Sequence, residues 1–142
     1  MARDSRGNIW FSTDTGIARY DGKRMDKWTG AQVANLRYLD AIYAAPDGRV
    51  WFGSGSSDPP TVFSFDGEDF SYFTRTNGPP SAVRKMAGDG KGIIWMASLT
   101  GLLRFDGTNF LNVTKQAGLE EIATDTPNVD RDGKVWFGLV WS

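Results

Sequence analysis

The stretch DSRGNIWFSTDTGIARYDG, residues 4–22, carries two signals that recur along the 142-residue chain. A Gly turn precedes a hydrophobic–Trp–aromatic run, and an Asp-Gly pair follows 11 residues after Trp10. The tryptophan recurs as Trp51, Trp95 and Trp136, at intervals of 41, 44 and 41 residues, each time with a Gly three positions before it. A constant period near 42 residues indicates a repeat architecture.

Each repeat predicts β-strands. The Asp-Gly phrase returns as TVFSFDGEDF (61–70) and GLLRFDGTNF (101–110), between short apolar or alternating runs. Asp-Gly between such runs is a strong hairpin signal, because Gly adopts the positive φ that the turn needs. About 40–45 residues with four antiparallel strands is the size of one β-propeller blade. We therefore predict an all-β chain of four-stranded antiparallel β-propeller blades, about three in number.

The predicted organisation is a single partial propeller over residues 1–142. Its blade repeats are expected at about 1–29, where the first strand of the four is missing or a stub, and at 36–74, 80–114 and 123–142, the last a partial blade. The best candidate for a helical turn is VTKQAGLEEIA, residues 113–123. We expect the repeated Trp10, Trp51, Trp95 and Trp136 to fill the structural core between blades, because large aromatic side chains on equivalent strands suit that place.

Composition excludes several classes of function. A net charge of −1 argues against a nucleic-acid partner, and no apolar run is long enough to predict membrane contact by this segment. The chain has no Cys and no His, so thiolate and imidazole metal sites and His-based catalysis are absent. Adjacent carboxylates occur at Glu68–Asp69 and Glu120–Glu121, but neighbours on a strand point to opposite faces. We expect a protein without catalytic residues, metal or cofactor.

A third phrase closes each unit as its expected fourth strand: MDKWT (25–29), FSYFT (70–74) and FLNVT (110–114). The three phrases, in this order, resemble the two-component regulator propeller repeat. The match is closest over residues 4–22, while the second unit has Ala45 where the pattern has Asp and a Pro-rich loop, GSGSSDPPT, at 53–61. The resemblance implies a sensor propeller of a bacterial regulator, in the periplasm or outside the cell, which often responds to carbohydrate. It does not by itself imply that this chain binds a sugar.

Strand counting suggests self-assembly. The first repeat supplies three of four strands and the last supplies two, and three blades are too few for a closed ring. We expect the ring to close by homo-oligomerisation, with the segment TPNVDRDGKVWFG (126–138) completing the first blade of a neighbouring copy. A homodimer gives six blades and a homotrimer gives nine, and both remain open. An arbitrary piece without specific assembly is the alternative.

One set of residues is a candidate ligand site at the mouth of the channel. Eleven residues before the repeated Trp, on the strand expected to line the central channel, stand Asp40, Arg84 and Asp125. Arg37 and Tyr38 lie just before Asp40, and Asn77 and Ser81 lie at comparable places in the next repeat. Aromatic and planar hydrogen-bonding groups suit a sugar. A solvated channel lining is the competing interpretation of the same residues.

Overall fold

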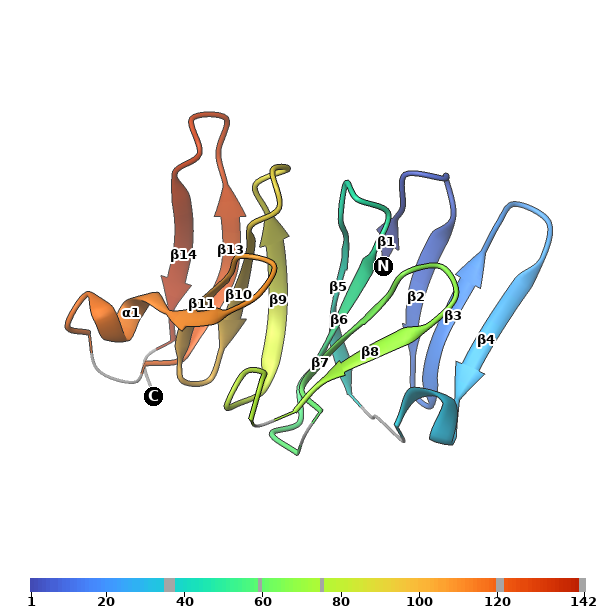
Figure 1. The fold of residues 1–142 in the computed structure, drawn as a ribbon, viewed down its shortest axis with the longest axis horizontal. Helices are drawn as coiled ribbons and strands as arrows, with labels where there is room; N and C mark the ends of the chain where they lie inside the picture. The colour runs from blue at the N-terminus through green and yellow to red at the C-terminus, as the bar shows by residue number, and fades with distance from the viewer. Residues whose placement is uncertain (35–37, 59, 75, 120–121, 141–142) are drawn as a thin grey trace.

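The computed structural model describes residues 1–34, 38–58, 60–74, 76–119 and 122–140. Strands hold 50 % of these residues and helices 6 %, which confirms the all-β prediction. Three four-stranded antiparallel sheets and one two-stranded sheet follow one another along the chain (Figure 1). Within each sheet the strands are neighbours in sequence order, the arrangement of a propeller blade.

The strands have the following bounds. Blade 1 consists of β1 (Ala2–Arg3), β2 (Ile9–Thr13), β3 (Gly16–Tyr20) and β4 (Met25–Thr29). Blade 2 consists of β5 (Leu39–Ala44), β6 (Val50–Ser54), β7 (Val62–Phe65) and β8 (Phe70–Phe73). Blade 3 consists of β9 (Val83–Gly88), β10 (Ile94–Ser98), β11 (Gly101–Phe105) and β12 (Phe110–Asn112). The two-stranded sheet, called the C-terminal hairpin below, consists of β13 (Thr124–Val129) and β14 (Val135–Leu139).

The Asp-Gly turns hold the third and fourth strands of each blade together. In blade 1, Asp21 Oδ1 accepts hydrogen bonds from the backbone N–H of Lys23 and Arg24, at 2.8 and 2.7 Å. Gly22 adopts φ +98°, a conformation that costs other residues a steric clash. The same pair of side-chain bonds recurs at Asp66 and at Asp106. Repeated local chemistry therefore explains why the strand pattern repeats.

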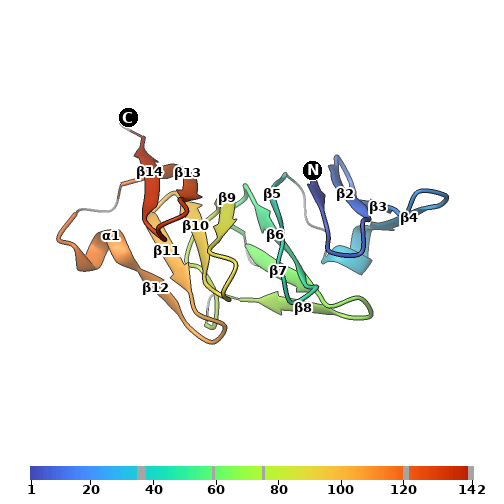
Figure 2. The ribbon, with the colours of Figure 1, turned by 90° about the horizontal axis from the view of Figure 1, so that it is seen from above.

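The sheets are arranged as a fan. Seen from above, the first strands β1, β5, β9 and β13 lie along one side, and the fourth strands β4, β8 and β12 spread apart on the other (Figure 2). Contacts between β1 and β5, β5 and β9, and β9 and β13 agree with this view. The first strand of each blade is therefore the inner strand, as a propeller requires.

The hydrophobic core lies between the blades. One buried cluster joins blades 1 and 2 through Trp10 and Phe52, and a second joins blades 2 and 3 through Trp51 and Phe105. Because successive residues of a strand point to opposite faces, β7 contributes Phe63 and Phe65 to the first cluster and Val62 to the second. Blade 2 is thus buried on both faces.

Two short helices follow the fourth strands. The fourth strand of blade 3, expected to run to Thr114, ends at Asn112 and gives way to α1 (Val113–Gln116), within the segment predicted for a helical turn. The Asn112 side chain caps this helix by accepting a hydrogen bond from Lys115 N at 3.0 Å. The 3₁₀ helix η1 (Gly30–Val33) has no counterpart in the sequence predictions. In the described part of the chain, neither helix is long or apolar enough to cross a membrane.

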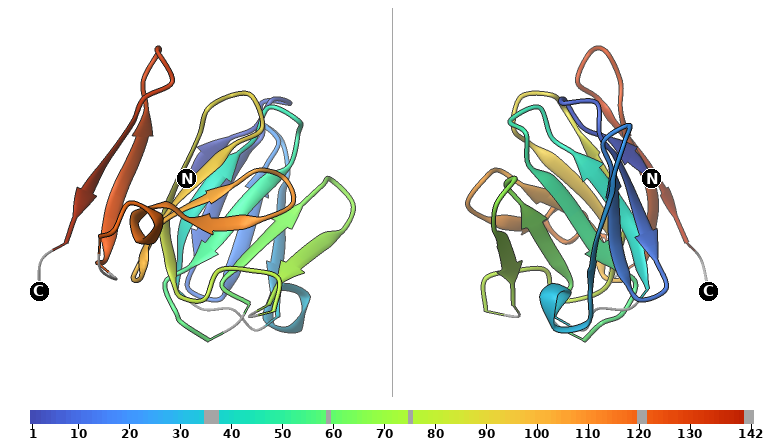
Figure 3. Two further views of the ribbon diagram at one scale, coloured as in Figure 1. Left: turned by 60° about the vertical axis from the view of Figure 1, so that its left-hand side comes forward. Right: turned by 90° about the vertical axis from the view of Figure 1, so that its right-hand side faces the viewer.

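The repeated tryptophans differ in burial. Trp10 is 1 % exposed and Trp51 is 5 % exposed, whereas Trp95 is half-buried and Trp136 is 64 % exposed. The core prediction is wrong for Trp136, because the C-terminal hairpin stands at one end of the row of sheets and no further described sheet covers it (Figure 3). Equivalent positions in the repeat are therefore not equivalent in packing.

Candidate functional site

The predicted residues Asp40, Arg84 and Asp125, called the inner-strand row below, lie on the neighbouring strands β5, β9 and β13. Two of them are bulge residues. The register of β5 with β6 shifts between Leu39 and Ala41, so Asp40 has no paired residue on β6. The register of β9 with β10 shifts in the same way, so Arg84 has no paired residue on β10. A β-bulge bends its strand and changes the direction of a side chain. Both side chains are exposed.

Asp125 completes the row in a different local setting. It pairs with Gly138 of β14, and the register shifts only after it, between Asp125 and Asn128. Its Oδ1 accepts a hydrogen bond from Thr126 N at 2.8 Å, and Thr126 has φ +43°. The half-buried Asp125 is thus engaged by its own backbone, which leaves it less free than Asp40 to bind a ligand.

Asp40 lies against the loop that joins β6 and β7. A side chain added at Gly55 would collide with the Asp40 carboxylate, so this glycine allows the carboxylate to approach the loop backbone. Gly55 N donates a hydrogen bond to Tyr38 O at 2.7 Å. Tyr38 is 72 % exposed at φ +58°, an uncommon conformation for a bulky residue. Arg37 lies outside the described residues.

The row is charged and open to solvent. Among the residues that the structure describes, no ion pair joins Arg84 to Asp40 or to Asp125. The neighbouring candidates serve the fold instead: Ser81 is buried and hydrogen-bonded to the Thr100 hydroxyl at 3.0 Å, and Asn77 Oδ1 accepts Thr74 N at 2.7 Å. The structure therefore places the row on three adjacent inner strands, while Asn77 and Ser81 are engaged by other residues.

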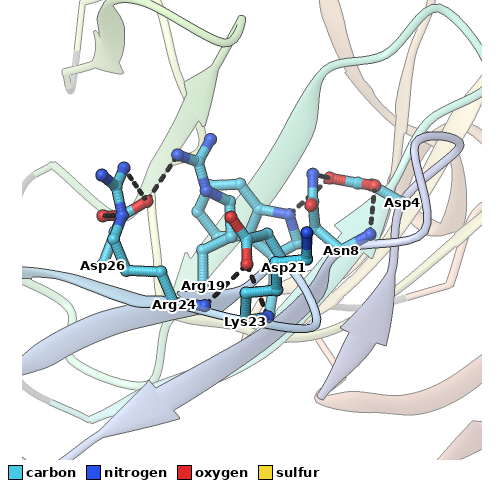
Figure 4. A network of polar contacts seen from close by, with 8 residues as sticks. Asp4, Asn8, Arg19, Asp21, Lys23, Arg24 and Asp26 are labelled. Carbon is cyan, nitrogen blue, oxygen red and sulfur yellow. Dashed lines mark hydrogen bonds and ion pairs between the residues drawn. The ribbon is translucent and has the colours of Figure 1, made fainter.

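A polar network covers the repeated Trp of blade 1 (Figure 4). The Arg19 guanidinium lies over Trp10 and Trp28, with Cζ 5.6 and 5.4 Å from the ring centroids. Its Nη2 also donates to Asp26 Oδ2 at 2.7 Å and forms an ion pair with that carboxylate. The hydrogen bond from Arg19 lowers the pKa of Asp26. Trp10 Nε1 donates to Asp4 Oδ2 at 2.8 Å. Burial raises the pKa of Asp4, but this bond and those from Asn8 outweigh it and leave the pKa below its ordinary value.

Two clefts lie between sheets, beside the turns that join first and second strands. These turns are at the end of the molecule opposite the loop beside Asp40 (Figure 1). The larger, about 590 Å³, lies between blades 2 and 3 and is lined by Tyr43, Arg49, Trp51 and Lys91, among others. The smaller, about 340 Å³, lies between blade 3 and the C-terminal hairpin. Sequence reasoning missed both. A signal existed for the larger one, because Ala45, which lines it, stands where the first repeat has Asp4.

Solved structures with this arrangement of sheets are known. Similar to this chain are the extracellular domain of the hybrid two-component system BT3049 from B. thetaiotaomicron (21 % identity over 96 % of this chain, TM-score 0.74) and that of the one-component system BT4673 from the same organism (16 % over 97 %, TM-score 0.76). The chain consists of β-propeller blades. It spans about a fifth of each of those solved chains, 20 % and 21 %.

A third similar structure is YCF48 bound to D1 peptide, at 14 % identity over 95 % of this chain and 44 % of that one, with a TM-score of 0.60. No protein-family model and no curated protein matches the chain. The first two neighbours agree with the resemblance drawn from the repeated phrases, because both are extracellular domains of regulatory systems. At these identities the likeness shows the fold alone.

Proposed function

We propose that the chain is a ligand-binding part of a periplasmic or extracellular sensor propeller, and that the inner-strand row together with Tyr38 forms its binding surface. The observation that carries this proposal is the pair of bulges at Asp40 and Arg84 on adjacent inner strands. Bulges are frequent beside functional sites, where they direct a side chain away from the regular ladder. The similarity to extracellular domains of regulators supports the location.

The chemistry of the row suits a hydroxylated ligand such as a carbohydrate. Carboxylates accept and guanidinium groups donate hydrogen bonds in fixed planes, so Asp40 and Arg84 on neighbouring strands offer both kinds of partner to vicinal hydroxyls. Tyr38 adds an exposed aromatic surface next to Asp40. Its left-handed backbone costs conformational energy, and such outliers cluster at binding sites. The row acts in this proposal by binding alone.

Binding to a panel of plant, host and microbial oligosaccharides tests the proposal. We expect at least one glycan to bind the full chain, and Arg84→Ala to weaken that binding at least tenfold. The matched control is Lys85→Ala, the next residue of β9, which is also exposed. No bound glycan, or equal binding by both variants, would overturn the proposal. Folding of each variant is checked by circular dichroism, which should show the strand spectrum unchanged.

Exposed apolar surface on the C-terminal hairpin favours a second candidate function, self-assembly. Trp136, Phe137 and Val140 are 64, 36 and 46 % exposed, and β14 is an unpaired edge among the described strands. Exposed aromatic surface beside an open strand edge is typical of an interface. In this second proposal, the segment 126–138 packs onto blade 1 of another copy, whose β1 holds only two residues. Homodimers and homotrimers would share blades in this way.

Light scattering decides between assembly and its absence. The chain mass is 15.7 kDa, so a dimer or a trimer is recognised as twice or three times that value. Deleting residues 123–142 should then remove the ring and lower solubility. A monomer at every concentration tested, or an assembly unchanged by the deletion, would rule out strand sharing while leaving the ligand proposal standing.

A further inference from the structure

The cleft between blades 2 and 3 is lined in part by Trp51, which lacks both polar partners of its counterpart in blade 1. Trp10 pairs across the sheet with Arg19, and Trp51 pairs in the same register with Ser64. Trp10 stacks on Trp28 with ring centroids 5.6 Å apart, and Trp51 stacks on Phe73 with ring centroids 5.4 Å apart. The aromatic frame is therefore repeated while the polar groups around it are changed.

The first change removes the acceptor of the indole N–H. Ala45 holds the place of Asp4, in a turn with the same backbone bonds: Ala45 N donates to Arg49 O at 2.8 Å, as Asp4 N donates to Asn8 O at 2.9 Å. Ala45 carries no carboxylate, and within the described ranges no atom accepts a hydrogen bond from Trp51 Nε1. A donor without a partner beside a cleft is available to a ligand.

The second change removes the side chain that covers the aromatic pair. In blade 1 the Arg19 guanidinium fills the space over Trp10 and Trp28. Ser64 is too short to do so, and its buried Oγ has no hydrogen-bond partner in the described structure. The cleft of about 590 Å³, lined by Trp51, Phe73 and other residues, lies on this face of blade 2. Pockets for small molecules have volumes of roughly 300–1,000 Å³.

The charge of the lining favours an anion. Arg49 and Lys91 line the cleft, and of the described lining residues Asp47 alone is acidic. Asp47 Oδ1 already accepts the backbone N–H of Arg49 at 2.9 Å. Tyr43 also lines the cleft, and burial together with the nearby Asp89 and Asp47 raises the pKa of its hydroxyl, which keeps it a hydrogen-bond donor. The charged lining residues are thus two cations and one carboxylate that is already hydrogen-bonded, with Asp89 nearby, and hydrogen-bond donors are available beside the place that Asp4 holds in blade 1.

We propose that this cleft binds a small ring compound carrying a carboxylate, which accepts the hydrogen bond from Trp51 Nε1 as the Asp4 carboxylate does from Trp10 in blade 1. The ring occupies the space beside Trp51 and Phe73 that Arg19 fills in blade 1. Arg49 and Lys91 supply the compensating positive charge. This site is independent of the inner-strand row, because it lies at the opposite end of the blades.

The indole N–H resonance of Trp51, assigned by triple-resonance NMR on the ¹⁵N-labelled full chain, reports binding directly. Sodium glucuronate tests a sugar acid, sodium benzoate tests an aromatic acid, and glucose is the uncharged counterpart of glucuronate. We expect a saturable shift of the Trp51 resonance with at least one of the two carboxylates and none with glucose. The carboxylate that binds identifies the ring chemistry.

A variant that restores the blade 1 pattern is the decisive control. Ala45→Asp supplies the acceptor within the chain and should weaken carboxylate binding at least tenfold. Ala34→Asp adds the same charge at an exposed turn with φ +54°, which Asp tolerates, and should leave binding unchanged. If Ala45→Asp does not fold, Lys91→Glu is the blocking variant, because it places a carboxylate at an exposed residue of the lining and should weaken carboxylate binding at least tenfold.

Three results would overturn the proposal: no saturable shift with either carboxylate, an equal shift with glucose, or binding that survives the blocking variant. Arg84→Ala should not affect the Trp51 resonance. The failure of the inner-strand proposal and the failure of this one are therefore distinguishable.

Discussion

Replacing Trp10 and Trp136 separately by Ala measures what packing between blades contributes. The two residues occupy the same repeat position, and each indole donates to the Asp six residues before it, at 2.8 and 2.9 Å. They differ in burial, at 1 and 64 % exposed. Trp10 also contacts Trp28, Phe52 and Phe65, with ring centroids 5.5–5.7 Å away. The pair of variants therefore separates interblade packing from the local hydrogen bond.

We expect Trp10→Ala to lower the free energy of unfolding by about 3–5 kcal/mol, the usual cost of a large aromatic removed from a core. Trp136→Ala should cost under about 1 kcal/mol, as exposed positions do. With a urea dependence of about 2 kcal/mol/M, the midpoint for Trp10→Ala falls by about 1.5–2.5 M. Urea titrations followed by circular dichroism give both values.

Equal losses for the two variants would refute the reasoning, because the burial difference would then have no energetic effect. A large loss for Trp136→Ala that grows with protein concentration would instead show that Trp136 is covered by another copy. The concentration series therefore belongs in the same experiment.

Three further predictions concern the polar groups and the glycine contacts. Arg19→Gln should lower the free energy of unfolding, measured by urea titration, by about 1–2 kcal/mol, because it removes a partly buried ion pair and the cation–π contacts. Arg24→Gln removes an exposed partner of the same carboxylate and should lower it by less. Hydrogen bonds from backbone N–H groups lower the pKa of the Asp66 carboxyl in the folded chain. The ionised carboxylate therefore stabilises the fold fully at pH values above the unfolded-state pKa of 3.8, and this stabilisation is lost as the pH falls through the lower pKa of the folded state. Asp66→Asn should therefore flatten the acid side of a plot of melting temperature against pH, and an unchanged slope would contradict this. Gly88→Ala should displace Tyr43, whose hydroxyl lies where the new Cβ would be, and should both destabilise the chain and change the NMR signals of the cleft.

Much of the fold could be predicted from the sequence because its causes are local. The Asp-Gly turns depend on a carboxylate that reaches backbone groups two and three residues on, and on a glycine with positive φ. Strands between such turns have little choice of partner, so the order of strands within each blade follows from the chain. The predicted helical turn near residue 113 also follows from a local cap at Asn112.

The candidate sites depended on the tertiary structure to a greater extent. The position of Asp40 and Arg84 on inner strands followed from the repeat, but their bulges did not, because a shift in register depends on the partner strand. The place of Arg37 lies outside the described residues. The cleft beside Trp51 is lined by Ala45 on one side and by residues of blade 3 on the other, so it appears only when the neighbouring blade encloses the space.

The sequence by itself determined the repeat, the strand order within a blade and the turns, since each rests on residues a few positions apart. Only the tertiary structure decided that Trp10 and Trp51 are buried while Trp136 is exposed, although all three follow a Gly turn at the same spacing. The physical reason is that the burial of a blade face depends on the blade packed against it, which lies about one repeat away in the chain, and no local pattern records whether that neighbour is there.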